Sequence, residues 1–139
     1  MDCRIINLSK YLDRRGNLSV IEECKDIPFE IKRTYWIYDV PGGEHRGGHA
    51  YRRNREFIVA MTGSFDVTVD DGHSRTTYSL NRSYYGLYIP EGTWRDLNNF
   101  STNSLALILA STPYDPADYI EDYDLYRQEY ISKDSDGNE

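Results

Sequence analysis

GEHRGGHAYRRNREFIVAMTG, residues 43–63, is the most informative stretch of this chain, because polar residues of catalytic types stand at fixed spacings between two glycines. Five residues separate the first glycine from His49, one separates His49 from Tyr51, and four more precede Glu56. Side chains two residues apart on a strand project to the same face, so a strand here would present His49 and Tyr51 together. A one-residue slip in strand pairing would turn both away.

Short runs rich in β-branched and aromatic residues, broken by turn residues, continue on both sides of this stretch. They cover residues 17–23, 31–40, 56–63, 64–72, 76–80, 84–90 and 104–112. Phe65, Val67 and Val69 alternate with polar residues and lead into Asp71-Gly72, a strong hairpin signal. This rhythm predicts an all-β sandwich or barrel.

The chain changes character after Pro113. Asp115 can cap a helix and Pro116 can occupy its first position. Apolar and aromatic residues then recur at helical spacing: Tyr119, Ile120, Tyr123, Tyr126 and Tyr130. We expect one C-terminal helix of about four turns, with this stripe in the core or in a dimer interface. The polar residues 132–139 predict a disordered tail, which leaves residues 1–131 as a single domain.

Composition excludes several functional classes. The 139 residues carry a net charge of −7, which disfavours binding to nucleic acid or to an anionic membrane surface. The N-terminus lacks the apolar core of a signal peptide and no run is long enough to span a bilayer, so we expect a cytoplasmic protein. Cys3 and Cys24 have neither metal-binding nor redox spacing, and we assign them no role.

Residues 43–63 resemble the first cupin motif, in which the middle positions are His, His and Glu. Residues 90–99, PEGTWRDLNN, resemble the second cupin motif, with Arg95 in place of its usual His. The resemblance implies a cupin domain, a jelly-roll β-barrel, followed here by the C-terminal α-helix. In metal-dependent cupins, three His and one Glu hold a metal, and here only His49 and Glu56 remain. Because neutral Tyr51 and cationic Arg95 are poor replacements for imidazole, we expect no metal and no other cofactor.

Among cupins, the chain resembles the dTDP-4-keto-6-deoxyglucose 3,4-ketoisomerases, the WxcM-like sugar isomerases. The resemblance runs through RRGNLSVIEE, IPFEIKRTYWIYDVPGGEHRGGHA, GLYIPEGTW and YDPADYIEDYDLYRQEYI, in the order of that family. It implies an enzyme that moves a carbonyl between C4 and C3 of a dTDP-linked 4-keto-6-deoxy sugar in surface-glycan biosynthesis. It also implies a homodimer whose N-terminal strands exchange between subunits.

The same resemblance assigns roles to single residues. His49 matches the family's first active-site His and would be the base. Tyr51 stands where the family has a second catalytic His and would act as an acid or as a donor to the enediolate, while Arg95 replaces another pocket His. Arg33, Tyr35 and Arg46 match positions near the active site; the two arginines suit a diphosphate, which guanidinium groups bind bidentately.

Other assignments stay open at this stage. Arg53 would share a face with His49 and Tyr51 and is placed in the substrate-binding set, although a solvated strand edge is as good an explanation. Trp94 either stacks on the nucleotide base or sugar or is a core aromatic. Because two active-site His are replaced, a catalytically silent paralogue that binds a sugar nucleotide or partners an active isomerase is an alternative to the isomerase. A related sugar-nucleotide epimerase is a further alternative, since a His base and a Tyr acid can reprotonate a sugar carbon.

Overall fold

The structure, a computed structural model, describes residues 2–137, with side chains described up to Ile131, and is built from two facing antiparallel sheets. Its elements are β1 (Arg4–Asn7), β2 (Lys10–Tyr11), β3 (Leu18–Ser19), β4 (Arg33–Tyr38), β5 (Arg46–Tyr51), β6 (Glu56–Thr62), β7 (Phe65–Asp70), β8 (Arg75–Leu80), β9 (Tyr85–Ile89), β10 (Trp94–Asn98), β11 (Leu105–Ala110), the 3₁₀ helix η1 (Pro116–Asp118), β12 (Tyr119–Ile120) and α1 (Tyr123–Gly137).

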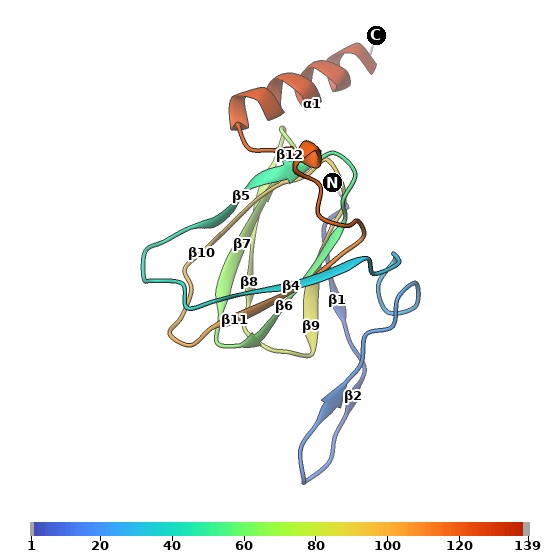
Figure 1. Ribbon diagram of the computed structural model, residues 1–139, viewed down its shortest axis with the longest axis vertical. Coiled ribbons are helices and arrows are strands. Elements are labelled where there is room, and N and C mark those ends of the chain that lie inside the picture. The colour runs from blue at the N-terminus through green and yellow to red at the C-terminus, as the bar shows by residue number, and fades with distance from the viewer. Residues whose placement is uncertain (1, 138–139) are drawn as a thin grey trace.

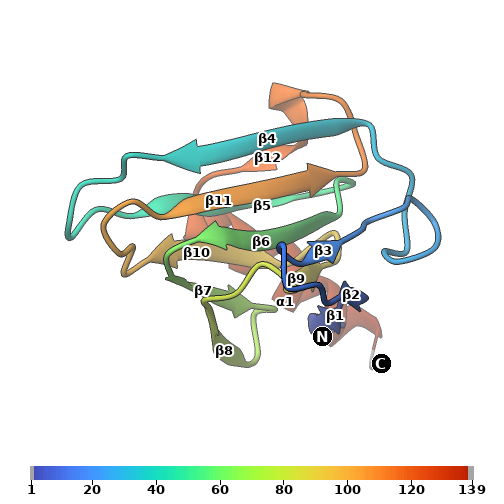
Figure 2. The same cartoon turned by 90° about the horizontal axis from the view of Figure 1, so that it is seen from below.

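One sheet has the strand order β1-β9-β6-β11-β4 and the other β12-β5-β10-β7-β8. Figure 2 shows the two sheets as layers, with β4 above β12 and β5 along one side. A small third sheet, the β2–β3 hairpin, extends away from the body, and α1 lies at the opposite end (Figure 1). The predicted all-β fold with one C-terminal helix is confirmed.

The core lies between the sheets because alternate residues of their strands point inward. In β7, Phe65, Val67 and Val69 are buried as the sequence alternation predicts. The strand then turns at Asp71-Gly72 into β8, so the predicted hairpin is also confirmed. Gly72 has a φ of +94°, a conformation that favours glycine.

Strand β6 is buried on both faces and therefore lacks this alternation. Ile58 and Ala60 face the core between the sheets. Phe57 and Val59 face the other way and contact a second cluster, which includes Leu8, Ile27 and Phe29 of the N-terminal segment. The N-terminal segment thus covers part of the outer face of this sheet, and the first five residues of β6 are buried.

The C-terminal segment differs from the single helix predicted to begin near Asp115. Asp115 caps only the short helix η1, and the next two residues, Tyr119 and Ile120, form β12. They form a strand because their backbone pairs with Tyr51 and Ala50 at the open edge of β5. Helix α1 begins at Tyr123, where the Asp122 carboxylate accepts hydrogen bonds from the first-turn N–H groups.

The aromatic stripe of α1 packs onto the second sheet, which is the core role predicted for it as one of two alternatives. Tyr126 is fully buried against Trp94 and Ala50, and its hydroxyl donates to the carbonyl oxygen of Gly92 at 2.7 Å. Tyr123 and Tyr130 pack at the margin of the same cluster.

Helix α1 continues to Gly137, into the segment predicted to be a polar tail. The side chains of residues 132–137 and all of residues 138–139 lie outside the described residues, so the predicted domain boundary at residue 131 stays a prediction. Within the described part of the chain, no helix is long and apolar enough to cross a membrane.

Candidate active site

A cavity of about 230 Å³ lies between the two sheets on the side formed by β4 and β5. Its apolar lining comes from one side chain on each of four strands: Ile37, Ile58, Leu97 and Ile108. Its polar lining is much richer than a core would need: Tyr35, Arg46, His49, Tyr51, Glu56, Arg95 and Tyr119. A space of this size fits a single sugar ring rather than a whole nucleotide sugar.

His49 and Arg95 face each other across the β5–β10 ladder, so both side chains enter the cavity from one wall. The ladder then shifts by one residue, because Leu97 pairs with Arg46 rather than with Gly47. This bulge lets Arg46 and His49, three residues apart, line the same cavity, which a regular strand would not allow. Gly47 takes up the bulge with a φ of +84°.

Glu56 is the anionic centre of the opposite wall. Its Oε1 accepts a hydrogen bond from Nη1 of Arg95 at 2.5 Å, and its Oε2 accepts one from the Tyr35 hydroxyl, also at 2.5 Å. Glu56 and Arg95 are each only 1% exposed. The cation that replaces the usual cupin His is therefore paired with the carboxylate that remains from the same motif.

The rings of Tyr51 and Tyr119 lie against the base candidate. The centroid of the His49 ring lies 4.7 Å from that of Tyr51 and 5.1 Å from that of Tyr119. The Tyr51 hydroxyl donates to the Tyr119 hydroxyl at 3.2 Å, and the Arg95 guanidinium lies 4.9 Å from the centre of the Tyr51 ring. These contacts fix the imidazole while leaving its Nε2 atom buried and without a hydrogen-bond partner among residues 2–137.

Burial and the nearby cations of Arg95 and Arg33 lower the pKa of His49 to about 3. The imidazole is therefore neutral at physiological pH and has a free lone pair, and the same surroundings make it a weaker base than an exposed histidine. Burial and the Glu56 carboxylate raise the pKa of both Tyr35 and Tyr51 above the usual value for tyrosine. Both phenols therefore keep their protons. The Tyr35 proton is held by Glu56 at 2.5 Å, whereas the Tyr51 hydroxyl, which donates to Tyr119 over 3.2 Å, can rotate toward a substrate oxygen.

The structure brings most of the predicted site residues together. His49, Tyr51, Tyr35, Arg46 and Arg95 all line the cavity. A sixth predicted residue, Arg33, lies next to it, with its guanidinium 4.9 Å from the centre of the Tyr35 ring.

Arg53 does not join this set. Strand β5 ends at Tyr51, and the Asp118 carboxylate then accepts hydrogen bonds from the backbone N–H groups of Arg53 and Asn54. The alternation on which the prediction relied therefore stops before Arg53, and its guanidinium pairs with Asp115 at 2.7 Å.

Trp94 also lies away from the cavity. Its neighbour Arg95 points inward, so Trp94 points to the other face of β10, where it contacts Tyr123 and Tyr126 of α1. Of the two roles that the sequence left open, the structure places Trp94 as a core aromatic.

Sequence reasoning missed Tyr119, which it assigned to a helix. Only the pairing of β12 with β5 brings this side chain to the cavity, and no local pattern shows that pairing. Glu56 was recognised only as a remnant of a metal site. Its present role had a signal in the sequence, because a fixed cation at Arg95 needs a buried anion nearby.

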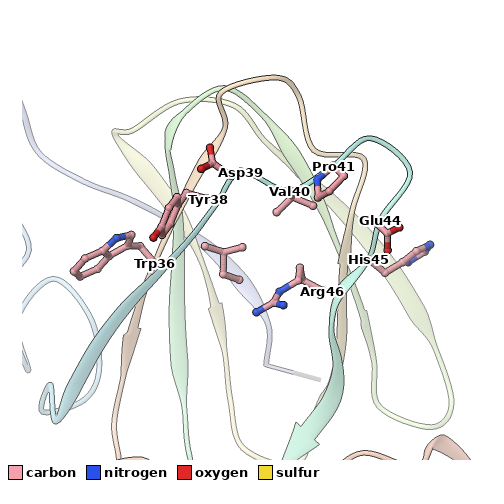
Figure 3. A pocket seen from close by; sticks show the side chains of 9 residues that line it. Trp36, Tyr38, Asp39, Val40, Pro41, Glu44, His45 and Arg46 are labelled. Carbon is pink, nitrogen blue, oxygen red and sulfur yellow. The ribbon is translucent and has the colours of Figure 1, made fainter.

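A second hollow of about 460 Å³ adjoins the cavity at the loop between β4 and β5. Ile37 and Arg46 line both spaces. Figure 3 shows the Arg46 side chain directed into the space between β4 and β5, with Trp36 and Tyr38 on one side and Glu44 and His45 on the other. Arg46 thus stands where a ligand too large for the inner cavity would continue outward.

Among the described residues, no group of three or more His, Cys, Asp or Glu side chains is arranged to hold a metal ion. The expectation of a metal-free site stays a prediction, which rests on the chemistry of Tyr51 and Arg95.

Comparison with known proteins places this site in a family. The family model described as FdtA: WxcM-like, C-terminal matches residues 1–131. The chain belongs to the FdtA family. The TDP-4-oxo-6-deoxy-alpha-D-glucose-3,4-oxoisomerase of Aneurinibacillus thermoaerophilus is 41% identical over 133 residues, which cover 96% of this chain and 95% of that protein.

Solved structures agree with this FdtA-family assignment. A 3,4-ketoisomerase from Helicobacter canadensis is 39% identical with a TM-score of 0.92, covering 94% of this chain and 98% of that one. The sugar 3,4-ketoisomerase QdtA from Thermoanaerobacterium thermosaccharolyticum, solved with TDP, is 32% identical with a TM-score of 0.92, covering 95% of this chain and 96% of that one. The predicted resemblance to this cupin family of ketoisomerases is confirmed.

Proposed function

We propose that this chain catalyses the interconversion of the 4-keto and 3-keto forms of a TDP-linked 6-deoxy sugar, as its FdtA-family relatives are named for doing. One observation carries the proposal. A neutral, buried His49 with an unpartnered Nε2 atom stands beside Arg95 in a cavity of sugar-ring size. A base and a fixed cation side by side are the two groups that proton abstraction next to a ketone needs.

The reaction requires one carbon-bound proton to leave and one to arrive. His49 takes the proton from C3, the C3–H electrons form a C3=C4 double bond, and the π electrons of the C4 carbonyl move onto O4, which gives an enediolate. The proton of the O3 hydroxyl passes to O4, the O3 electrons form the C3 carbonyl, and the electrons of the C3=C4 double bond take the proton back from the imidazolium at C4. Composition and oxidation level are unchanged, so no oxidant or reductant is consumed.

The other cavity residues would stabilise the charge that develops on O3 and O4. Tyr51 keeps its proton and would turn it from Tyr119 to one oxygen, while Arg95 pairs with His49 across the β5–β10 ladder and would attract the other. Arg33 and Arg46, the first residues of β4 and β5, would bind parts of the nucleotide diphosphate outside the cavity. Trp94 and Arg53 have no part in this proposed site.

We also propose that the chain acts in the cytoplasm as a homodimer with exchanged N-terminal strands. We call residues 9–20, which include the β2–β3 hairpin, the arm. The arm extends from the body (Figure 1) and exposes Tyr11, Leu12 and Leu18. The outer face of the β4–β11–β6 sheet exposes three further large apolar side chains: Trp36, Tyr38 and Met61. A second copy that laid its arm on this face would cover both apolar surfaces.

Proton NMR of TDP-4-keto-6-deoxyglucose in D₂O tests the proposed activity. We expect deuterium to enter the sugar and a 3-keto product to appear. His49→Asn should slow both by about 10²–10⁴-fold, the usual contribution of a general base, while His73→Asn in the exposed β7–β8 turn should change neither. Deuterium entry without a 3-keto product would indicate an epimerase, and an unchanged spectrum despite TDP binding would indicate a silent binding protein.

A further inference from the structure

Glu56 is a buried, charged residue of the first motif that the proposed reaction does not use. It begins β6, a central strand with β11 on one side and β9 on the other. Its carboxylate lies on the cavity wall rather than on the protein surface. A carboxylate in this position is costly to bury unless each oxygen is bonded.

Both oxygens are in fact bonded, and one partner is the cation beside the base. Arg95 donates a hydrogen bond from Nη1 to Glu56 at 2.5 Å and another from Nη2 to the backbone carbonyl oxygen of Thr93 at 3.2 Å. Two of the three guanidinium nitrogens are therefore fixed by the protein. The third, Nε, is buried and has no hydrogen-bond partner among the described residues.

The unpartnered donor of Arg95 and the unpartnered acceptor of His49 lie on paired residues of neighbouring strands. A substrate carbon next to a ketone presents the matching combination, a proton to be removed and a neighbouring carbonyl oxygen that becomes negative. The orientation of Nε–H depends on the other two nitrogens, because the guanidinium is planar and rigid.

We propose that Glu56 is the positioning residue of the isomerisation, and that it holds Arg95 so that its Nε–H donates to the substrate oxygen that becomes negative when His49 removes the proton from the neighbouring carbon. This inference rests on the proposed function. Stability alone does not explain the pair, because well-packed apolar residues of similar volume would be at least as stable as a buried ion pair. An apolar pair would, however, leave the enediolate without the Arg95 donor.

A double-mutant cycle in the NMR assay tests this inference. Arg95→Met should lower kcat by about 10²-fold, the scale for losing one preorganised donor, and Glu56→Gln should lower it by about 10-fold or more. The double variant should be no slower than Arg95→Met within about 3-fold, because Glu56 has nothing left to position. The TDP dissociation constant of Glu56→Gln should stay within about 3-fold of the wild-type value, because the inference places the loss in kcat rather than in binding.

The comparison remains decisive if Glu56→Gln alone does not fold. Arg95→Met leaves a buried carboxylate that can take up a proton, and the double variant leaves no buried charge at this pair, so equal kcat values for these two proteins support the inference. Asp70→Asn is the matched control, since Asp70 is also buried and bonded to an arginine, Arg75, but lies outside the cavity. It should lose stability and keep its kcat.

Losses that multiply in the double variant would overturn the inference, because Glu56 would then act independently of Arg95. A fall in kcat for Asp70→Asn equal to that for Glu56→Gln would overturn it as well, by showing a general effect of stability. If the wild-type protein exchanges no deuterium, the proposed function fails first and the inference fails with it.

Discussion

His49 illustrates how the surroundings of a residue prepare it for chemistry. An exposed imidazole is about half protonated near pH 6.5, but burial and two arginine cations keep this one neutral down to much lower pH. The same cations that repel a proton would attract the enediolate oxygens. Replacing a pocket His by Arg95 therefore changes the charge of the site without removing its base.

The lowered pKa of His49 makes stability depend on pH in a defined direction. The unfolded chain takes up a proton at His49 near pH 6.5, whereas the folded chain does so only near pH 3. As the pH falls below about 6.5, protonation favours the unfolded state, so the free energy of unfolding decreases. Relative to His49→Gln, wild-type protein should lose roughly 2 kcal/mol more between pH 6.5 and 4.5.

Urea denaturation of both proteins at several pH values measures this difference. His73→Gln, at an exposed turn, provides the comparison and should follow the wild-type curve. Parallel curves for wild type and His49→Gln would contradict the neutral, buried imidazole.

At the level of single residues, the sequence predicted the site where strand alternation holds. His49 and Tyr51 were placed correctly because β5 is regular between them. Arg53 was placed incorrectly because the strand ends at Tyr51, and a backbone bond to Asp118, 65 residues away in sequence, determines that end. Tyr119 was missed for a similar reason.

At the level of elements, β12 shows why helical spacing alone misled the prediction. Tyr119 and Ile120 fit the spacing of the following helix, but an unpaired edge of β5 offers their backbone groups better partners. Asp118 secures this arrangement, because its buried carboxylate accepts two backbone hydrogen bonds from the turn after β5, at 2.8 and 3.0 Å. The hairpin at Asp71-Gly72 was predictable because its signal is local.

Asp118→Ala should therefore be more damaging than the length of β12, the two-residue strand that follows Asp118, suggests. It leaves two backbone N–H groups in the turn without their acceptor, which should cost about 3 kcal/mol of unfolding free energy. It should also lower kcat, because Tyr119 would no longer be held against Tyr51. Asp115→Ala removes the cap of η1 and an exposed ion pair, and should cost only about 1 kcal/mol.

Thermal and urea unfolding of the two variants, with kcat from the NMR assay, measures these effects. Equal destabilisation by Asp118→Ala and Asp115→Ala would show that the turn after β5 does not depend on the buried carboxylate.

At the scale of the whole molecule, positive charge gathers at the cavity although the chain as a whole is negative. The chain carries a net charge of −7, yet Arg33, Arg46 and Arg95 lie in or beside one cavity. The excess of acidic residues elsewhere disfavours polyanions such as nucleic acid, while the local cations would favour a small diphosphate. Composition predicted this separation in outline, but only the β5 bulge shows how Arg46 joins the group.

The arm and the exposed sheet face predict the behaviour of the whole molecule in solution. The wild-type protein should sediment as a dimer, with twice the mass of the 16.2 kDa chain. Leu12 is 73% exposed at the arm and Trp36 is 58% exposed on the sheet, so each would be covered only by a second copy. A stable dimer of this kind would bury about 1,200–2,000 Å², and a carboxylate placed inside it would be desolvated without a partner.

Leu12→Asp and Trp36→Asp should therefore shift the protein to monomer at micromolar concentration, whereas Leu125→Asp on α1, also exposed, should remain a dimer. Sedimentation equilibrium distinguishes these results, and a monomeric wild-type protein, or a dimer that tolerates both arm and sheet variants, would rule out the exchanged-arm assembly.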